Sequence, residues 1–343
     1  MRDREPIQSL MHQVDVALLG FGNVGRAFAD YIGRMGDPRI RLRVRALADR
    51  SGGTLVESDQ ALQRIIDHKT VGRPLREFAG SSTLTDSRAF IDQLTLAGVR
   101  VLVESLPTNL KDGQPALDLN SAALRAGLHV VTVDKGPLVH GFAALQQAAQ
   151  TGGARLGFTG TTGVSIPDEL AGERLIEIRG VLNGTTNYIL TEMRERGASF
   201  DEALRSAQAA GVAEPDPSLD VDGWDTAVKT LILAQALMNA DTRLDEVTRI
   251  GISQETDDLI RVGRESHRVV RLVGRARLYQ GRARVSVVPK LVGEESPFYA
   301  VNGTSKLAVF RTASRREVIS AARSGRDAIA QTIVDDIVKV IAR

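Results

Sequence analysis

The sequence VDVALLGFGNVGRAFADYIGRMG, residues 14–36, combines a short apolar run, a glycine-rich turn and helical spacing in that order. The apolar run at 14–19 has the length and composition of a buried strand. After the first glycine, apolar residues recur at the spacing of one helix face, at Phe21, Val24, Phe28, Tyr31 and Ile32. The segment therefore predicts a strand, a tight turn and a helix.

A glycine pattern occupies the predicted turn. Gly20, Gly22 and Gly25 match the motif G-x-G-x-x-G, with Asn23 and Val24 between the last two glycines. Between a strand and a helix, the first glycine can make the turn, the second admits a pyrophosphate against bare backbone, and the third lets helix and strand approach closely. The unpaired N–H groups at the start of the helix suit the phosphates. The motif therefore predicts a dinucleotide site, and NAD or NADP is the expected cofactor.

An acidic residue ends the next predicted strand. The strand at 40–48 is followed by Asp49, at the distance from the glycines where an acid normally binds the adenosine ribose. Asp49 could equally begin a turn before Ser51, a position that suits aspartate. Arg50 could instead contact a 2′-phosphate, so the choice between NAD and NADP stays open.

Strands and helices alternate beyond this unit. Further strands are predicted at 100–104 and 128–133, with helical spacing at 115–127 between them. This alternation is typical of an α/β fold of the Rossmann type, with a doubly wound parallel sheet. We assign residues 14–150 to this dinucleotide-binding domain, after a flexible N-terminus at 1–13.

The pattern changes after residue 150. Strands at 155–159 and 175–181 lead into polar loops, and a further pair of strands is expected within 274–285. These features predict a separate α+β domain over 151–317. The last residues, 318–343, have helical spacing, and we expect them to form a helix that packs back onto the first domain.

Composition excludes several classes of function. The chain has 343 residues, 43% of them hydrophobic, which is enough for the cores of two domains. Its 44 Lys and Arg exceed its 42 Asp and Glu only narrowly, whereas a protein that binds nucleic acid usually carries a clear excess of positive charge. Cysteine is absent, which excludes disulfides and thiolate chemistry. No apolar run is long enough to span a bilayer, and the first residues lack the pattern of a signal peptide. We therefore expect a cytoplasmic protein that binds a small polar ligand, with no nucleic acid or membrane as partner.

Polar residues follow the third and fourth predicted strands. Ser105 and Thr108 lie in the loop 104–109, and Lys135 follows the strand at 128–133. Open α/β folds bind their ligands at the carboxyl ends of the strands, so this loop is a candidate floor for the nicotinamide. A lysine at a strand end is more often simply solvated, and Lys135 taken alone carries no stronger interpretation.

A loop with four acids and two prolines, AEPDPSLDVDG, occupies residues 213–223. Asp220 and Asp222 have the spacing of part of a calcium loop, but the glutamate that completes such a loop is missing. We therefore predict no metal site. Acids that face a substrate ammonium are the favoured interpretation of this loop.

The next segment, 224–239, is predicted to be a buried helix, because it is apolar on almost every side. Asp225 and Lys229 lie four residues apart on one face of it. On an exposed helix such a pair adds only a few tenths of a kcal/mol. A buried ammonium costs several kcal/mol to desolvate, and proteins tend to keep such groups for chemistry.

A helix N-terminus is also expected at residues 183–190, NGTTNYIL, which follow the strand at 175–181. Asn-Gly can form a hairpin turn, but no second strand follows here. Gly184 and the hydroxyls of Thr185 and Thr186 would then offer donors to a carboxylate or carbonyl oxygen. Donors for a carboxylate, acids for an ammonium and lysines together indicate a site for an amino acid.

Five stretches of the chain resemble the homoserine dehydrogenase family in order and spacing: GFGNVG, ESLPTNLKDGQPAL, HVVTVDKGPL, GVLNGTTNYIL and AEPDPSLDVDGWDTAVK. The resemblance covers nearly the whole chain. It implies a nucleotide domain, a mixed-sheet domain for substrate binding and dimerisation, and a homodimer. The implied reaction is the reversible NAD(P)H-dependent reduction of L-aspartate 4-semialdehyde to L-homoserine, in the synthesis of threonine, methionine and isoleucine.

The resemblance also implies roles for individual residues. Lys229 and Lys135 match the pair that binds the reacting oxygen and handles its proton, with Asp225 orienting Lys229. Glu214 matches the acid that binds the substrate amino group. Asp220 and Thr185, the latter next to Gly184, match other positions that line the substrate.

The sequence departs from the family pattern at three positions. Asp134 stands where the family commonly has asparagine, Leu106 where it has threonine, and Thr159 where it has a glutamate near a monovalent-cation loop. The last change puts sodium binding in doubt. The first two leave open a related hydroxy or keto amino acid as substrate. A catalytically silent dinucleotide sensor is a further alternative, against which the retained lysines and acids argue. The C-terminal regulatory domain of some relatives is not expected here.

Overall fold

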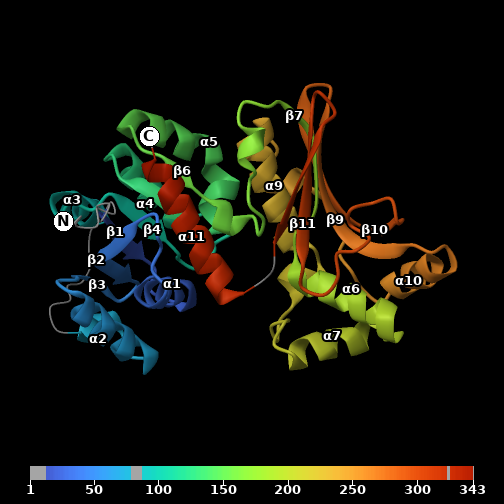
Figure 1. Cartoon of the computed structure of the whole chain (residues 1–343), viewed down its shortest axis with the longest axis horizontal. Coiled ribbons are helices and arrows are strands. Elements are labelled where there is room, and N and C mark those ends of the chain that lie inside the picture. The colour runs from blue at the N-terminus through green and yellow to red at the C-terminus, as the bar shows by residue number, and fades with distance from the viewer. Residues whose placement is uncertain (1–12, 79–86, 323–324, 343) are drawn as a thin grey trace, which may run out of the picture.

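A computed structural model describes residues 13–78, 87–322 and 325–342. The predicted flexible N-terminus, apart from Gln13, lies outside the described residues. Figure 1 shows two halves side by side, each built around one sheet, with α11 returning from the second half to the first. Within the described part of the chain, no helix combines the length and apolar character needed to cross a membrane.

The first sheet has six strands in the order β3-β2-β1-β4-β5-β6. All its pairings are parallel except the one between β2 and β3, which is antiparallel. This arrangement confirms the predicted Rossmann-type α/β fold. The strands are β1 (Gln13–Leu19), β2 (Arg41–Asp49), β3 (Gly52–Leu55), β4 (Val101–Glu104), β5 (His129–Thr132) and β6 (Leu156–Gly157).

Strand β6 corrects one prediction, which placed the strand at 155–159 beyond the domain boundary. In the structure it pairs in parallel with β5, so it belongs to the first sheet. The physical reason is a crossover connection: a helix follows β5 and ends at Gly153, whose left-handed φ of 64° turns the chain back towards the sheet. The change of sequence pattern therefore comes after this sheet is complete.

Helices cover both faces of the first sheet, because the side chains of its central strands are apolar on both sides. Val14, Val16 and Leu18 of β1 belong to one buried cluster, and Ala17 and Leu19 to another. The first cluster includes residues of α1, α2 and α11, and the second includes residues of α3, α4 and α5. The helices are α1 (Asn23–Arg34), α2 (Asp59–Thr70), α3 (Ser87–Leu96), α4 (Ala116–Arg125), α5 (Lys135–Gly152) and α11 (Arg326–Ile341).

The prediction of a helix over residues 318–343 was wrong for the first residues of that range. Strand β12 (Glu317–Ala322) pairs with β11 at the edge of the second sheet, and the helix begins only at Arg326. The apolar spacing that predicted the helix lies entirely within α11. Its buried residues Ile333 and Ile337 pack in the same cluster as β1.

The second sheet has six strands in the order β12-β11-β7-β9-β10-β8. The predicted pair within 274–285 is confirmed as the hairpin β9–β10, whose turn residues Gln280 and Gly281 both have positive φ. The remaining strands are β7 (Leu175–Val181), β8 (Thr248–Arg249), β9 (Val269–Tyr279), β10 (Arg282–Val292) and β11 (Lys306–Thr312).

Five α-helices of the described chain accompany this sheet: α6 (Gly184–Arg196), α7 (Phe200–Ala209), α8 (Ser218–Val221), α9 (Trp224–Met238) and α10 (Thr256–Glu265). Helix α7 begins with a capping box formed by Ser199 and Glu202. Short 3₁₀ turns complete the described elements, at Leu75–Glu77, Thr159–Thr161, Asp168–Leu170 and Leu244–Glu246.

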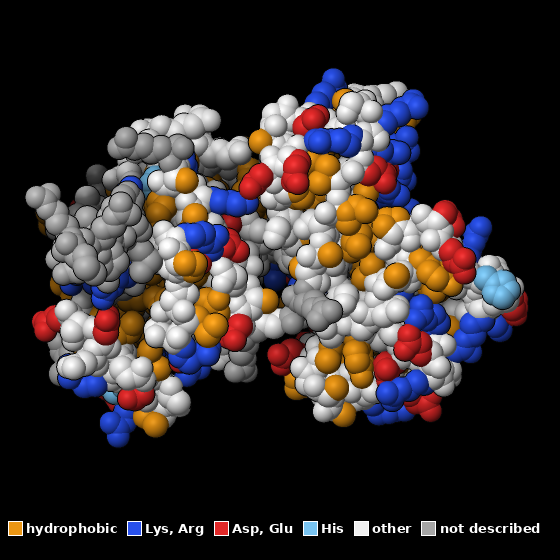
Figure 2. Space-filling view, viewed as in Figure 1, with side chains coloured by type: hydrophobic (Ala, Val, Ile, Leu, Met, Phe, Trp, Pro, Cys, Tyr) orange, Lys and Arg blue, Asp and Glu red, His pale blue; other side chains and the backbone are white. Residues whose placement is uncertain are grey.

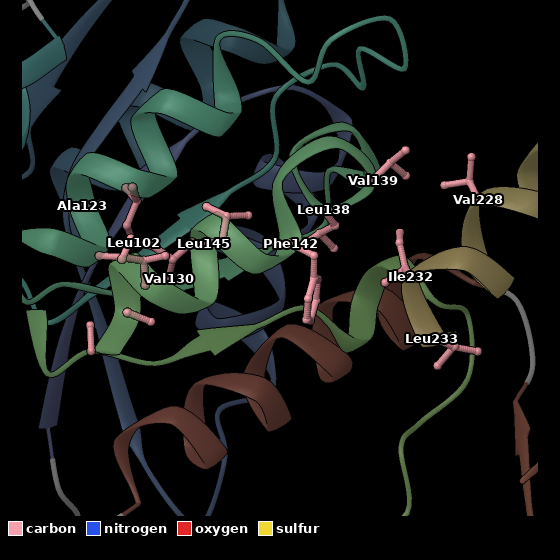
Figure 3. Packing of buried hydrophobic residues seen from close by; sticks show 14 of the residues in the cluster. Leu102, Ala123, Val130, Leu138, Val139, Phe142, Leu145, Val228, Ile232 and Leu233 are labelled. Atoms are coloured by element: carbon pink, nitrogen blue, oxygen red, sulfur yellow. The ribbon is translucent and has the colours of Figure 1, made fainter. Parts of the chain in front are cut away.

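Helix α9 joins the two halves and is buried, as predicted. It packs against β7, β9 and β10 on one side and against α5 on the other. Figure 3 shows Val139 of α5 facing Val228 of α9, and Phe142 and Ile232 belong to the same apolar cluster. This contact places the first turns of α9 beside the carboxyl edge of the first sheet.

Candidate active site

A cleft of about 500 Å³ lies where the two halves meet. Figure 2 shows the surface hollowed between the halves, with a Lys or Arg side chain at the bottom. The cleft is lined by several residues that the sequence singled out and by others that it did not, among them Lys306. The lining residues that the sequence singled out are Val24, Ser105, Leu106, Thr108, Lys135, Thr159 and Lys229.

The glycine-rich turn has the geometry that its motif predicts. Gly20 has φ +98°, and a Cβ there would lie 2.5 Å from the carbonyl oxygen of Ser105. A Cβ on Gly25 would overlap the carbonyl oxygen of Gly20, so the third glycine permits close packing of α1 on β1. A Cβ on Gly22 would meet no atom within 4 Å. The backbone at Gly22 therefore lies open beside the start of α1, at Asn23, where no side chain caps the helix.

Asp49 begins the turn before Ser51, which the sequence analysis gave as the alternative to ribose binding. Its Oδ1 accepts hydrogen bonds from the backbone N–H and hydroxyl of Ser51, and its Oδ2 lies 2.6 Å from Nζ of Lys69. Burial alone would raise the pKa of Asp49, but the hydrogen bonds from Lys69 and Ser51 hold it below its usual value. The side chain of Arg50 is exposed beside it. Lys69 was missed by the sequence, because it reaches Asp49 from the far end of α2.

The loop after β4 is fixed to the glycine-rich turn. The hydroxyl of Ser105 donates a hydrogen bond to the carbonyl oxygen of Gly20 at 2.8 Å. Thr108 hydrogen-bonds the side chain of Asp134, and Asp134 caps α5 by accepting from the N–H of Gly136. The loop predicted as the floor of the nicotinamide site is therefore fixed on both sides, to the turn after β1 and to the residues that follow β5.

The buried carboxyl group of Glu104 is hydrogen-bonded to the backbone of this loop. Glu104 is fully buried and accepts hydrogen bonds from the N–H of Leu106, the side-chain amide of Asn120 and the hydroxyl of Thr132. Burial, with a smaller contribution from the charge of Asp134, raises the pKa of Glu104 to about 7. Sequence analysis did not single out Glu104. The available signal was an acid at the end of a four-residue strand that is otherwise apolar.

The predicted catalytic residues come together across the cleft. Asp225 Oδ2 lies 2.6 Å from Nζ of Lys229, and Asp225 Oδ1 lies 3.3 Å from Nζ of Lys135. Lys229 also donates to the carbonyl oxygen of Leu182 at 3.0 Å. Burial would raise the pKa of Asp225, but the two ammonium groups, together with a hydrogen bond from Asn183, hold it well below its usual value. The carboxylate is therefore ionised and joins a lysine of each half.

The N-terminus of α6 lies next to this group. Asn183 caps the helix, because its Oδ1 accepts from the N–H of Thr186. Its side-chain amide donates to Asp220 at 2.5 Å and to Asp225 at 2.8 Å. Burial raises the pKa of Asp220, against the opposing effect of the Asn183 hydrogen bond. Asn183 thus joins Asp220 to Asp225, a link that the sequence did not reveal.

Three of the predicted substrate residues lie beside this network, and the fourth does not contact it. Thr185 donates its hydroxyl to the carbonyl oxygen of Val212, and Gly184 begins α6. Glu214, two residues beyond Val212, is exposed, and its carboxylate makes no ion pair with any residue in the described ranges. The acidic loop forms no group of three metal-binding side chains in the described part of the chain.

Thr159, where the family pattern has glutamate, contacts α11. Its backbone N–H donates to Asp336 Oδ2 at 2.7 Å. Burial raises the pKa of Asp336 to about 6, against the hydrogen bonds from Thr159. The sequence did not single out Asp336, since its partner lies far away along the chain.

Comparisons with known proteins agree with this geometry. The family model described as the NAD binding domain of homoserine dehydrogenase matches residues 20–159, and the homoserine dehydrogenase model matches residues 165–338. A homoserine dehydrogenase of Methanocaldococcus jannaschii is 31% identical over 341 residues, covering 95% of this chain and 98% of that protein. An NAD(+)-dependent homoserine dehydrogenase of Pseudomonas canavaninivorans is 30% identical over 347 residues, covering 96% and 97%.

Solved structures show the same similarity. A putative homoserine dehydrogenase from Archaeoglobus fulgidus has a TM-score of 0.80 at 27% identity, covering 96% of this chain and all of that one. A hyperthermophilic archaeal homoserine dehydrogenase in complex with NADPH has a TM-score of 0.75 at 28% identity, covering 96% of this chain and 97% of that one.

Proposed function

The chain belongs to the homoserine dehydrogenase family of NAD(P)-dependent oxidoreductases that act on a CH–OH group, and we propose that Lys229, Lys135 and Asp225 form its catalytic centre. The reaction interconverts L-aspartate 4-semialdehyde and L-homoserine. The observation that carries the proposal is the carboxylate of Asp225 between two ammonium groups from different halves of the molecule.

The residues around the glycine-rich turn fit a dinucleotide. The open backbone at Gly22 and the uncapped start of α1 would hold the pyrophosphate, while Val24, Ser105 and Thr108 would border the nicotinamide. Asp49 would bind the adenosine ribose. When bound, the dinucleotide accepts or supplies the hydride.

The lysines would act on the oxygen of the substrate. In the reducing direction this oxygen gains negative charge, and an ammonium already in place stabilises that charge and donates a proton to it. Lys229 is well placed for this part, because Leu182 and Asp225 fix its Nζ and only 13% of its side chain is exposed. Asp225 keeps the two ammonium groups together in a cleft where they would otherwise repel each other.

Substrate binding would use the residues beside this centre. Asp220 and Glu214 supply carboxylates for the substrate ammonium, and Gly184 and Thr185 supply donors at the start of α6. Glu214 is available for this role because its carboxylate is unpaired among the described residues.

A homodimer is the expected assembly, and the open face of the second sheet supports it. Gly274 faces Thr230 of α9, so the next residue, Arg275, points to the other face. There Arg275 and Arg311, each about one-third exposed, both pair with the buried carboxylate of Glu177. A second copy could cover this charge-matched face. We also propose that the enzyme works in the cytoplasm and that its ligand, besides the cofactor, is a small amino-acid substrate.

The test is an assay of homoserine oxidation with NAD and with NADP, beside a panel of other hydroxy amino acids. Homoserine should be the preferred substrate. Preference for another hydroxy amino acid would favour the alternative that Leu106 and Asp134 leave open. Absence of turnover on the whole panel, with dinucleotide binding intact, would favour a silent sensor.

A further inference from the structure

A third lysine lines the cleft, and the proposed chemistry does not use it. Lys306 is the first residue of β11 and is half-buried. A Cβ placed on Gly163 would lie 3.4 Å from both Cδ and Nζ of Lys306, and 3.5 Å from the carbonyl oxygen of Leu182. That carbonyl is the acceptor for Lys229. Gly163 therefore lies between Lys306 and the group that holds the catalytic lysine.

The ammonium of Lys306 has no anionic partner of its own. Lys229 and Lys135 share the carboxylate of Asp225, whereas Lys306 makes no ion pair or hydrogen bond with any residue in the ranges 13–78, 87–322 and 325–342. Two arginines of the same sheet, Arg275 and Arg311, are matched by the carboxylate of Glu177. Lys306 is therefore an unmatched positive charge within a confined space.

The charges that face Lys306 make this arrangement costly without a ligand. Burial, with smaller contributions from the charges of Lys229 and Lys135, lowers its pKa to about 8, against the opposing effect of Asp225. An anion bound in the cleft would supply the missing partner, and a charge-assisted hydrogen bond to it would be strong in so confined a site.

The substrate offers one such anion. In an amino acid whose reacting oxygen lies at Lys229, the carboxylate is several atoms away. Lys306 lines the same cleft but comes from β11, whereas Lys229 comes from α9. We propose that Lys306 binds the α-carboxylate of the amino-acid substrate together with the donors of Gly184 and Thr185 at the start of α6, and that its charge selects amino acids over simple amino alcohols. The inference rests on the proposed function, because it concerns the substrate of the same site.

The test compares homoserine with 3-aminopropan-1-ol, which is homoserine without its carboxylate. The specificity constant kcat/KM is measured for both at saturating cofactor in the wild type, in Lys306→Met and in Lys306→Arg. Lys290→Met is the matched control, since it removes a half-buried lysine of the same sheet that does not line the cleft. The dissociation constant of NADPH is measured in parallel by fluorescence.

Lys306→Met should lower kcat/KM for homoserine by about ten- to a hundredfold, the range for a lost charged hydrogen bond, and should change the value for 3-aminopropan-1-ol by less than about threefold. Lys306→Arg should recover part of the loss, and Lys290→Met should match the wild type. The inference would be overturned if kcat/KM fell equally for both substrates, so that the ratio of the two values stayed unchanged. It would also be overturned if the main effect were a weakened affinity for NADPH.

A second measurement needs no variant. L-2-Aminobutanoate has the carboxylate of homoserine but no hydroxyl, and propylamine lacks both. On the wild type, the inhibition constant of L-2-aminobutanoate should rise as pH passes through about 8, where Lys306 loses its proton, while that of propylamine stays constant. Parallel behaviour of the two inhibitors would contradict the assignment. If the wild type does not oxidise homoserine at all, the proposed function itself fails, and this inference fails with it.

Discussion

Asp225 and Lys229 are separated by one turn of α9, and their charged atoms lie 2.6 Å apart beside the cleft between the two halves of the molecule, which Lys229 lines. The same carboxylate reaches Lys135 on the opposite side, 3.3 Å away. An i,i+4 pair on a helix surface is a small contribution to stability. Here the pair is extended across the cleft, so it positions two ammonium groups where the substrate oxygen is proposed to bind.

Asp225→Asn should lower kcat by about tenfold or more. The variant keeps the shape of the side chain but leaves Lys229 and Lys135 without their shared counter-charge, so the two ammonium groups repel each other. Steady-state kinetics with homoserine at saturating cofactor measure the effect. Asp222→Asn is the matched control, because Asp222 is exposed on the adjacent loop. An Asp225→Asn enzyme as active as this control would show that the carboxylate has no role in the reaction.

Glu104 should make the stability of the protein depend on pH. Its pKa rises from the ordinary 4.5 to about 7 in the folded state, so between these values the folded protein holds a proton that the unfolded chain releases. The free energy of unfolding should therefore fall as pH rises from about 4.5 to about 7. In Glu104→Gln this part of the pH dependence should disappear.

Thermal unfolding at several pH values across this interval, for the wild type, Glu104→Gln and Glu57→Gln, provides the measurement. Glu57 is exposed, so its variant should follow the wild type. Identical pH dependence in all three proteins would mean that Glu104 is ionised in the folded state throughout this range.

The glycine-rich turn allows a comparison of two substitutions within α1. Gly25→Ala should lower the free energy of unfolding by about 1–3 kcal/mol and weaken dinucleotide binding, because the new Cβ would overlap the backbone at Gly20. Gly33→Ala, where nothing lies within 4 Å, should be stabilising by about 0.5–1 kcal/mol. Chemical denaturation and NADPH titration measure both. Equal stability of the two variants would contradict the close approach of α1 to β1.

Glu214→Gln should act through the substrate and not through the cofactor. If this exposed carboxylate binds the substrate ammonium, its loss should raise KM for homoserine by about tenfold, with kcat and the dissociation constant of NADPH nearly unchanged. Asp216→Asn is a suitable control, because the Asp216 carboxylate accepts from the N–H of Ser218 within the same loop. A KM equal to that of the control would remove Glu214 from the site.

Much of the fold could be predicted from local patterns. The glycine motif between an apolar run and a helical pattern predicted the first sheet, and the apolar helix after the acidic loop predicted a buried α9. The placement of β6 and β12 could not be predicted. Strand β6 has only two residues, and it joins the first sheet by pairing with β5, which lies on the other side of α5 along the chain. Strand β12 pairs with the preceding strand β11, and the helical spacing of α11 begins only after it.

The candidate site, like the fold, could be predicted where local spacing along the chain revealed it. Asp225 and Lys229 are neighbours on one helix, so their spacing revealed them. Glu104, Lys69 and Lys306 acquire their significance from partners that other elements supply, and no periodicity marks such partners. Asn183 was seen as the start of a helix, but its bridge between two carboxylates exists only in the folded chain.

The central claim is that the ammonium of Lys229 acts on the reacting oxygen, and Lys229→Ala tests it most directly. The kcat for homoserine oxidation should fall by orders of magnitude, while the dissociation constant of NADPH and the thermal stability stay close to those of a Lys290→Ala control. A fall of less than tenfold, equivalent to about 1.4 kcal/mol in the activation barrier, would contradict the assignment of Lys229 as the catalytic group.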